Sequence, residues 1–124
     1  ECMQLNFGVF RKEAPMQEGI KKLEELRARI GDAYLGDKSM AFNTARLEAL
    51  ELDNLLEIAE ATAYSAEGRR ESRGAHARDD FQERDDENWL AHSIYSPETK
   101  QLSQRAVNFS PKTMDTMEPM IRKY

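Results

Sequence analysis

Cysteine is nearly absent from this 124-residue sequence, since Cys2 is the only one. A single cysteine excludes an intrachain disulfide, a CxxC redox pair and a cysteine-ligated iron–sulfur cluster built by this chain alone. No apolar run approaches the roughly 20 residues that a helix needs to span a bilayer. Positive charge is also in deficit, and at a formal net charge of −5 any binding of phosphate or anionic lipid would need a local cluster. The composition, 40% hydrophobic and 33% charged, instead predicts one compact domain with polar loops.

Motifs of catalytic and cofactor sites are missing as well. The sequence has no GxGxxG and no GxxxxGK[ST] segment, so it offers no cradle for a nucleotide or dinucleotide. Ser72 lies in ESRG rather than in a GxSxG turn, and no histidine–carboxylate pair is placed by spacing to activate it. His76 and His92 lack an HExxH or calcium-loop context and are interpreted as hydrogen-bonded structural residues. We therefore expect no catalytic, cofactor-binding or metal-binding residue in this chain.

Apolar residues recur at helical spacing near the N-terminus and predict two helices. Met3, Phe7 and Phe10 lie four and three positions apart, which indicates a short first helix. A second apolar stripe runs through residues 16–30, with Pro15 in the first turn. The opposite face of this second helix carries oppositely charged pairs at i to i+4 spacing and is expected to be solvated.

The third helix is predicted to be the longest, with Asn43 as its N-cap and Gly68 as its stop. A helix that is apolar over most of its circumference must be covered on more than one side. We therefore expect it at the centre of a helical bundle formed by residues 1–68. Its apolar residues are Leu47, Leu50, Leu52, Leu55, Leu56, Ile58, Ala59 and Ala63.

Residues 69–124 lack a sustained helical period and are predicted to complete the same domain. A charged loop with a short helical turn near RDDENWL comes first, and Trp89 is expected to anchor it on the bundle. The segments AHSIY and QLSQRAVNF, joined by SPETK, are predicted to pair as a short β-hairpin. The tail contains Pro111 and Pro119, so it cannot be one helix, and we expect it to be ordered only along another surface.

The charged loop is basic in its first half and acidic in its second. Residues 69–78 hold four arginines against one glutamate, a net +3, whereas residues 79–87 hold six carboxylates against one arginine, a net −5. The acidic half would repel the phosphates that a basic surface attracts, so nucleic acid is not an expected partner. Arginine forks could instead meet carboxylates within the loop or across an interface.

The loop also carries a resemblance. The motif ESRGAHARDD, followed by RDDENW and then His92, resembles the C-terminal region of the flavoprotein subunit of succinate dehydrogenase and fumarate reductase. The similarity extends over the whole chain, through GVFRKEAPMQEGI, FNTARLEALELDNLLEIAEATAYSA and the ending IRKY. ELDNLLEIAEATA is more similar to succinate dehydrogenase than to fumarate reductase. L-aspartate oxidase shares ESRG but typically lacks the RDDENW continuation.

The resemblance implies a fold, an enzymatic activity, a cellular location and a position of this chain within a longer protein. It implies a three-helix bundle of spectrin-repeat-like character followed by a small irregular and β region. The complete subunit would oxidise succinate to fumarate through covalent FAD and pass electrons to an iron–sulfur subunit and, through membrane anchors, to quinone. It would lie at the cytoplasmic face of the bacterial inner membrane. Because its FAD and substrate residues belong to preceding domains, none is carried over to this chain, which is expected to be one piece of the longer protein.

Within that subunit, we expect the charged loop to hold the domain interface. Its partners would be the subunit's own FAD-binding and capping domains and the iron–sulfur subunit, with the membrane anchors reached only indirectly. The alternatives are the corresponding domain of fumarate reductase or L-aspartate oxidase, and a free-standing helical interaction module. The residues expected to form the docking and ion-pair loop are Arg69, Arg70, Arg73, His76, Arg78, Asp79, Asp85 and Asp86.

Overall fold

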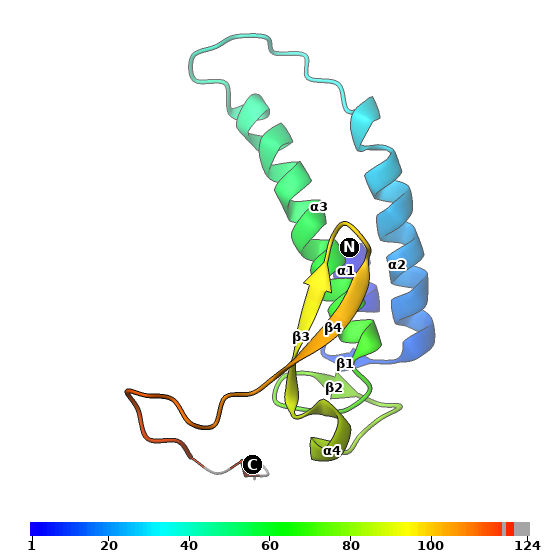
Figure 1. Cartoon of the computed structure of the whole chain (residues 1–124). Coiled ribbons are helices and arrows are strands. Elements are labelled where there is room, and N and C mark those ends of the chain that lie inside the picture. The colour runs from blue at the N-terminus through cyan, green and yellow to red at the C-terminus, as the bar shows by residue number, and fades with distance from the viewer. Residues whose placement is uncertain (118, 121–124) are drawn as a thin grey trace.

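The computed structural model describes residues 1–117, 119 and 120. Two long antiparallel helices form its frame, a short N-terminal helix lies against the first, and a β-hairpin packs on the second (Figure 1). In chain order, the elements are α1 (Cys2–Asn6), β1 (Phe10–Arg11), α2 (Glu13–Ala28), the 3-10 helix η1 (Ile30–Asp32), α3 (Thr44–Gly68), β2 (Ala77–Arg78), α4 (Asp86–Trp89), β3 (Ala91–Ser96) and β4 (Gln101–Ala106).

The mainly helical fold with one short antiparallel hairpin is confirmed. α3 starts directly after Asn43, whose Oδ1 accepts a hydrogen bond from the backbone N–H of Arg46 at 2.8 Å, and it ends at Gly68 as predicted. α4 lies where the sequence predicts a short helical turn. In the part of the chain that the structure describes, no helix combines the length and apolarity needed to cross a membrane.

The buried core lies where α1, α2 and the C-terminal half of α3 meet. Gly19 allows α1 to approach α2 closely, because a Cβ at this position would lie 2.5 Å from Cε2 of Phe7. Close packing of this kind leaves no room for a methyl group. The buried apolar side chains are Phe7, Met16, Leu23, Leu56, Ala63 and Ala66.

The prediction that Phe10 lies on the face of the first helix is wrong. α1 ends at Asn6, and Phe7 adopts a non-helical φ of −129° as its C-cap. The chain then extends, so that Phe10 pairs with Ala77 in a two-residue parallel ladder and its side chain is exposed. Glycine is a poor helix former, and Gly8 follows directly after the point where the helix stops.

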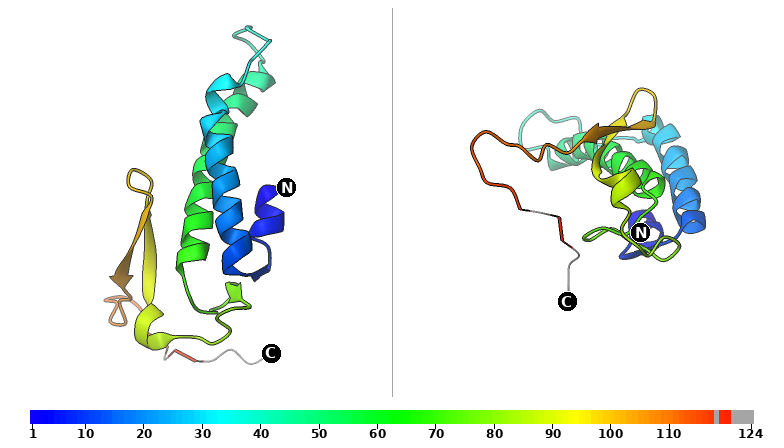
Figure 2. Two further views of the ribbon diagram at one scale, coloured as in Figure 1. Left: turned by 90° about the vertical axis from the view of Figure 1, so that its right-hand side faces the viewer. Right: turned by 60° about the horizontal axis from the view of Figure 1, so that its bottom comes forward.

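The expectation that α3 is covered on more than one side holds for its C-terminal half only. There α2 lies on one side and the β-hairpin on the other (Figure 2). The hairpin extends along α3 as far as Glu60, where Lys100 in its turn lies 3.9 Å from the carboxylate. In the N-terminal half, Leu47 and Leu50 are both 61% exposed, although Met40 and Phe42 of the preceding segment lie beside them.

The hairpin has the predicted strands, paired from Ala91 with Ala106 to Ser96 with Gln101. β4 ends three residues before the predicted end of its strand segment. The hairpin reaches α3 at Gly68, where a Cβ would lie 2.3 Å from Cδ1 of Leu102. Gly68 therefore both ends the helix and admits the hairpin.

Beyond β4, the described residues of the tail contain no helix or strand, in agreement with the prediction that the tail is not one helix. The tail leads away from β4 (Figure 2) and comes back to the charged loop, where Nη1 of Arg84 donates to the carbonyl oxygen of Met120 at 2.7 Å. Met114, Met117 and Met120 are exposed along it. The IRKY ending lies outside the described residues.

Candidate functional site

The charged loop, residues 69–90, lies at the end of the α2–α3 pair where α3 stops and α2 begins (Figure 1). A tight turn shapes its first part, with Arg73 and His76 exchanging backbone hydrogen bonds of 2.9 and 3.0 Å. Gly74 takes a φ of +58° in this turn, a conformation that glycine adopts without a steric cost. The ESRGAH motif therefore folds back on itself and directs its side chains to the helix ends.

Arg78 closes the C-terminus of α3. Its side chain is only 1% exposed, and Nη1 donates to the carbonyl oxygens of Ala66, Glu67 and Arg69 at 3.3, 2.9 and 3.4 Å. The last carbonyl groups of a helix have no partner within the helix and carry partial negative charge. A guanidinium at this position satisfies several of them at once.

Asp80 joins the same arginine to the start of α2. Its carboxylate accepts two hydrogen bonds from Arg78, from Nε at 2.7 Å and from Nη2 at 2.8 Å. Its Oδ2 also accepts from the backbone N–H of Glu13, the first residue of α2, at 2.9 Å. The hydrogen bonds from Arg78 hold the pKa of Asp80 well below its usual range. The Arg78–Asp80 pair thus places a cation at one helix C-terminus and an anion at the neighbouring N-terminus, as both helix dipoles favour.

Glu71 is the second centre of the loop and is fully buried. Its carboxylate accepts from Nε of Arg69 at 2.8 Å, from Nε and Nη2 of Arg73 at 2.8 and 3.0 Å, and from the backbone N–H of Asp85 at 2.9 Å. Burial by itself raises the pKa of Glu71, but the hydrogen bonds from Arg73, Asp85 and Arg69 outweigh it and lower the pKa. A buried carboxylate is stable here because two guanidinium groups surround it.

Arg69 extends this cluster to the hairpin. Its Nη1 donates to the carbonyl oxygen of Ala91 at 3.0 Å and to Oγ of Ser93 at 3.1 Å, and Nη2 donates to the carbonyl of Trp89. The guanidinium also lies over the Trp89 ring, 5.5 Å from its centroid. Trp89 is therefore held against the end of the bundle, although it is only partly buried.

His76 uses both ring nitrogens inside the loop. Nδ1 lies 2.7 Å from Nη1 of Arg11 and must be the acceptor, because a guanidinium only donates. Nε2 then carries the proton and donates to the carbonyl of Arg69 at 3.0 Å. Burial, together with the charges of Arg11, Arg78 and Arg69, lowers the pKa of His76, so the ring is neutral at pH 7. The interpretation of His76 as a hydrogen-bonded structural residue agrees with this geometry.

One family accounts for the whole chain. The sequence model described as "Fumarate reductase flavoprotein C-term" matches residues 1–124. The chain belongs to this family. It is 50% identical to the succinate dehydrogenase flavoprotein subunit of Coxiella burnetii over 122 residues, which are 98% of this chain and 21% of that subunit. It is 36% identical to the fumarate reductase flavoprotein subunit of Haemophilus influenzae, over 98% of this chain and 20% of that subunit.

Solved structures agree with the sequence comparison. A chain of E. coli quinol fumarate reductase matches 94% of this chain with a TM-score of 0.80 and 36% identity, through 20% of its own length. A quinol-fumarate reductase solved with menaquinol molecules matches 91% of this chain with a TM-score of 0.76 and 35% identity, through 20% of its own length. The chain thus spans about a fifth of the length of the relatives it matches, and the resemblance carried by the ESRGAH and RDDENW motifs is confirmed.

Not all of the predicted loop residues of this flavoprotein domain join the buried cluster. Arg70 lies 3.1 Å from Glu13 and Asp79 lies 3.4 Å from Lys12, and all four side chains are substantially exposed. Such pairs contribute little to stability.

The two remaining acids lie beside the buried cluster. The Asp85 carboxylate accepts from the backbone N–H and the side-chain amide of Asn88 and caps α4. Asp86 lies 2.6 Å from Arg73 and also pairs with Arg84. Arg69, Arg73, His76 and Arg78 therefore form the interior of the predicted loop, and Arg70, Asp79, Asp85 and Asp86 form its rim.

Sequence reasoning missed the two carboxylates that organise the loop, Glu71 and Asp80. It also missed Ser72, whose Oγ accepts from the backbone N–H of Arg78 at 2.8 Å and donates to the carbonyl of Phe81 at 2.8 Å. A usable signal exists for the carboxylates: each stands two positions from an arginine, and residues two apart lie on one face of an extended chain. Arg11 has no such signal, because it meets His76 across 65 positions.

In the described residues, no group of three or more histidine, cysteine, aspartate or glutamate side chains could hold a metal ion. The N-termini of α2, α3 and α4 are also not free to hold the phosphate groups of a dinucleotide such as FAD, which bind to unpaired N–H groups at a helix N-terminus. Asp80 occupies that position on α2, Asn43 on α3 and Asp85 on α4.

Proposed function

We propose that this chain is the C-terminal domain of a succinate dehydrogenase flavoprotein subunit and serves in it as a structural and docking domain. The complete subunit would oxidise succinate to fumarate through FAD held by its other domains, and would pass electrons to an iron–sulfur subunit and on to quinone. The support for this substrate direction is the 50% identity to the Coxiella burnetii subunit over nearly the whole chain. The fumarate reductase relatives, at 36% identity in Haemophilus influenzae, supply the second candidate activity.

The structural role is supported by one observation: the hydrogen-bonding atoms of the buried loop side chains already have partners within this chain. Each side-chain nitrogen of Arg78 and both ring nitrogens of His76 are hydrogen-bonded to groups of this chain. The Glu71 carboxylate has four hydrogen bonds from three residues. A substrate dicarboxylate would have to displace these internal bonds, so the loop is built to hold the domain together rather than to bind substrate.

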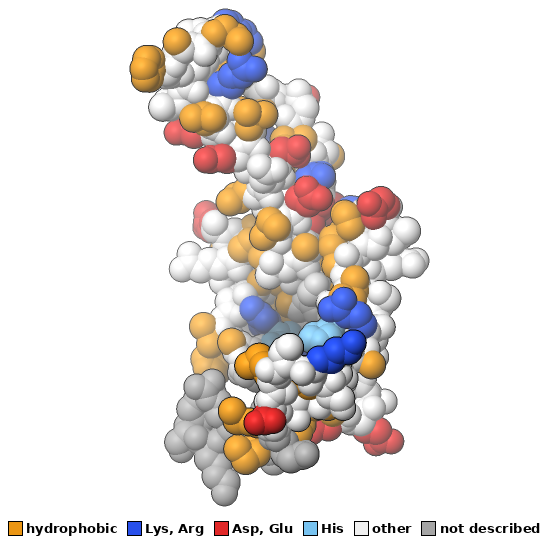
Figure 3. Space-filling model, turned by 60° about the vertical axis from the view of Figure 1, so that its left-hand side comes forward, with side chains coloured by type: hydrophobic (Ala, Val, Ile, Leu, Met, Phe, Trp, Pro, Cys, Tyr) orange, Lys and Arg blue, Asp and Glu red, His pale blue; other side chains and the backbone are white. Residues whose placement is uncertain are grey.

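The docking role draws on the exposed residues. Apolar side chains gather on the face shown in Figure 3, at the tip (residues 33–43) and along the helices below it. The exposed apolar side chains of the tip are Tyr34, Met40 and Phe42, and exposed apolar groups in such numbers are typical of a surface that another surface covers. The proposed partners are the subunit's own FAD-binding and capping domains and the iron–sulfur subunit, and the membrane anchors would be reached only through these. Assembly would place the domain at the cytoplasmic face of the bacterial inner membrane.

The first test is an assay of the complete gene product and of the isolated chain. The complete subunit is expected to carry bound flavin and to reduce a dye with succinate, whereas residues 1–124 alone are expected to show neither property. Comparing quinone-linked succinate oxidation with quinol-linked fumarate reduction in the assembled complex separates succinate dehydrogenase from fumarate reductase. Oxidation of L-aspartate instead would assign the chain to L-aspartate oxidase, and stoichiometric flavin on the isolated chain would refute the allocation of FAD to other domains.

The second test concerns docking and uses Arg73→Ala in the complete subunit. Arg73 joins buried Glu71 to exposed Asp86, so its loss is expected to loosen the loop and lower the yield of assembled, flavin-containing complex. Arg70→Ala is the matched control, because Arg70 lies outside the buried cluster, in an exposed pair with Glu13 and 6.0 Å from the centroid of the Phe81 ring. If assembly and flavin content were unchanged in Arg73→Ala and only turnover fell, Arg73 would belong to the catalytic machinery instead.

A further inference from the structure

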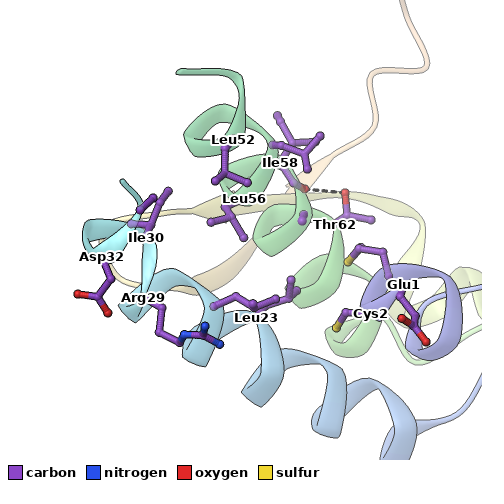
Figure 4. A pocket seen from close by; sticks show the side chains of 15 residues that line it. Glu1, Cys2, Leu23, Arg29, Ile30, Asp32, Leu52, Leu56, Ile58 and Thr62 are labelled. Carbon is purple, nitrogen blue, oxygen red and sulfur yellow. Dashed lines mark hydrogen bonds between the residues drawn. The ribbon is translucent and has the colours of Figure 1, made fainter. Parts of the chain in front are cut away.

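Two sides of α3 differ in the chemistry that they present. On one side, Leu52, Leu56 and Ile58 line an apolar groove between α3 and α2 (Figure 4). The β-hairpin covers a different side, where the carboxylate of Glu60 lies 3.9 Å from Nζ of Lys100 in the hairpin turn. An apolar side chain needs only close packing, whereas a buried carboxylate needs hydrogen-bond donors. The hairpin side of α3 therefore makes the stricter demand on its surroundings.

Glu60 is buried at this junction, and the cations beside it are too distant for direct hydrogen bonds. The residue is only 5% exposed. Its Oε1 lies 3.9 Å from Nζ of Lys100, and its Oε2 lies 3.9 Å from Nε of Arg27. Both distances exceed the roughly 3.2 Å upper limit of an ordinary N–H···O bond. Among the described residues, Oε1 has no hydrogen-bond partner, a state that costs free energy and that native proteins rarely leave uncompensated.

The hydroxyl group of Tyr95 in β3 is a second buried polar group that makes no hydrogen bond to the described part of the chain. The Tyr95 ring stacks on the ring of Tyr64, with centroids 5.5 Å apart. Tyr64 lies four positions after Glu60 in α3, and therefore on the same face of the helix. Burial raises the pKa of the Tyr95 hydroxyl, and the negative charge of Glu60 raises it further, so the hydroxyl is protonated and able to donate.

Lys100 brings a third polar group to the same place from the turn between β3 and β4. Its Nζ donates to Oε1 of Glu24 in α2 at 3.1 Å and lies 5.8 Å from the centroid of the Tyr64 ring. An ammonium group has three donors, so Lys100 has donors left after its bond to Glu24. Glu60, Tyr95 and Lys100 thus supply one acceptor and two donors from three different elements.

A polar contact across more than about 3.5 Å is the distance at which a water molecule bridges two groups. Buried water typically makes about three hydrogen bonds to polar groups that otherwise have no partner. A metal cation fits this place less well, because the Lys100 ammonium would repel it at short range. We propose that one ordered water molecule lies between α3 and the hairpin, donates to Oε1 of Glu60, and accepts from the Tyr95 hydroxyl and from Nζ of Lys100. The hairpin is then held on α3 by a water-mediated link.

Tyr95→Phe in the complete subunit tests the proposal. Removing a hydroxyl without a partner would relieve an uncompensated cost, whereas removing one that donates to bound water weakens the link between α3 and the hairpin. We therefore expect the backbone amides of β3 and β4 to exchange hydrogen for deuterium faster in this variant, measured by mass spectrometry. Tyr34→Phe is the matched control, because Tyr34 is 85% exposed in the tip segment, and it should leave exchange in the hairpin unchanged.

A crystal structure of the same subunit is the direct check, because it does not depend on how a variant folds. The expected result is one water molecule at hydrogen-bond distance from Oε1 of Glu60, Oη of Tyr95 and Nζ of Lys100. A direct hydrogen bond between Tyr95 and Glu60, or a metal ion at this place, would overturn the proposal. Hairpin exchange in Tyr95→Phe that is no faster than in the unsubstituted subunit would overturn it as well.

Discussion

At the loop end of the α2–α3 pair, charged side chains are buried and paired, whereas at the tip end apolar side chains are exposed. Glu71 and Arg78 are both buried, and each has several hydrogen bonds within the chain. Phe42 and Met40, at the opposite end, contact water. The placement of charge is thus the reverse of a simple rule that puts apolar groups inside and charged groups outside. The difference fits the proposed docking role, in which the loop interior is held together within this chain and the exposed tip is covered by another surface.

Arg78→Ala is expected to destabilise the loop end more than any of the other substitutions below. The substitution removes three contacts to the last carbonyls of α3 and leaves Asp80 without its bidentate partner. Breaking a buried ion pair from one side costs about 3–5 kcal/mol, and the 28% exposure of the Asp80 side chain places this pair at the lower end of that range. We expect a loss of this size in the free energy of unfolding of the chain, measured by urea denaturation. Arg70→Ala, which removes an exposed pair with Glu13 and a 6.0 Å contact with the Phe81 ring, should cost about 1 kcal/mol or less. Equal losses in the two variants would contradict the assignment of Arg78 to the interior.

The sequence predicts the elements better than it predicts the contacts between them. Asn43, Gly68 and the hairpin follow from local signals, because caps and turns depend on residues a few positions apart. The link from Arg78 through Asp80 to Glu13 joins the ends of two helices and depends on how they pack. The spacing of these residues in the sequence does not indicate how the two helices pack against each other.

The same limit explains the errors in the sequence analysis. Leu47 lies in an apolar pattern that predicts cover on several sides, but the pattern does not say whether the cover belongs to the same chain. Phe10 keeps the helical spacing, yet the chain leaves the helix at Phe7 and pairs with β2 instead. Of the loop, the arginines were predictable from their charge, and the position of Glu71 two residues from Arg69 and from Arg73 is a signal for pairing with them. The burial of Glu71 was not predictable, since it depends on the three-dimensional surroundings of the carboxylate.

Acidification should weaken the loop end in two steps. Burial and nearby arginines lower the pKa of His76, and hydrogen bonds lower the pKa values of Glu71 and Asp80. Because the unfolded chain binds these protons more readily than the folded chain, their stabilising contribution is present above the unfolded pKa values and is lost as the pH falls through the folded ones. The decline is expected to begin near pH 6.5 for His76 and near pH 4 for the carboxylates.

Urea midpoints measured from pH 8 to pH 3 report this profile. His76→Gln is the diagnostic variant, because a glutamine amide can still accept from Arg11 and donate to the carbonyl of Arg69. It should remove the first step of the decline and leave the second. A first step that persists in His76→Gln would assign it to another group.

Substitution of Phe42 tests the tip end and is expected to give the smallest change in stability. It has a φ of +52°, in the left-handed region that costs a residue with a side chain about 1–2 kcal/mol, and the fully exposed ring recovers nothing within this chain. Asn43 holds the backbone before Phe42 through Nδ2, which donates to the carbonyls of Asp37 and Ser39 at 3.0 Å each, and the backbone after it through Oδ1, which accepts from the N–H of Arg46 at 2.8 Å. Phe42→Gly should therefore raise the free energy of unfolding of the isolated chain by about 0.5–1 kcal/mol, after the greater flexibility of glycine in the unfolded state is subtracted.

The control for this prediction is Phe42→Ala, which removes the ring but keeps the Cβ that makes the conformation unfavourable. Urea denaturation should show no gain for Phe42→Ala beside the gain for Phe42→Gly. If alanine stabilised the chain as much as glycine does, the cost would lie in the exposed ring and not in the backbone. With glycine alone effective, the strained conformation at the tip is a cost that this chain bears without return, which is expected of a side chain held in place for contact with another surface.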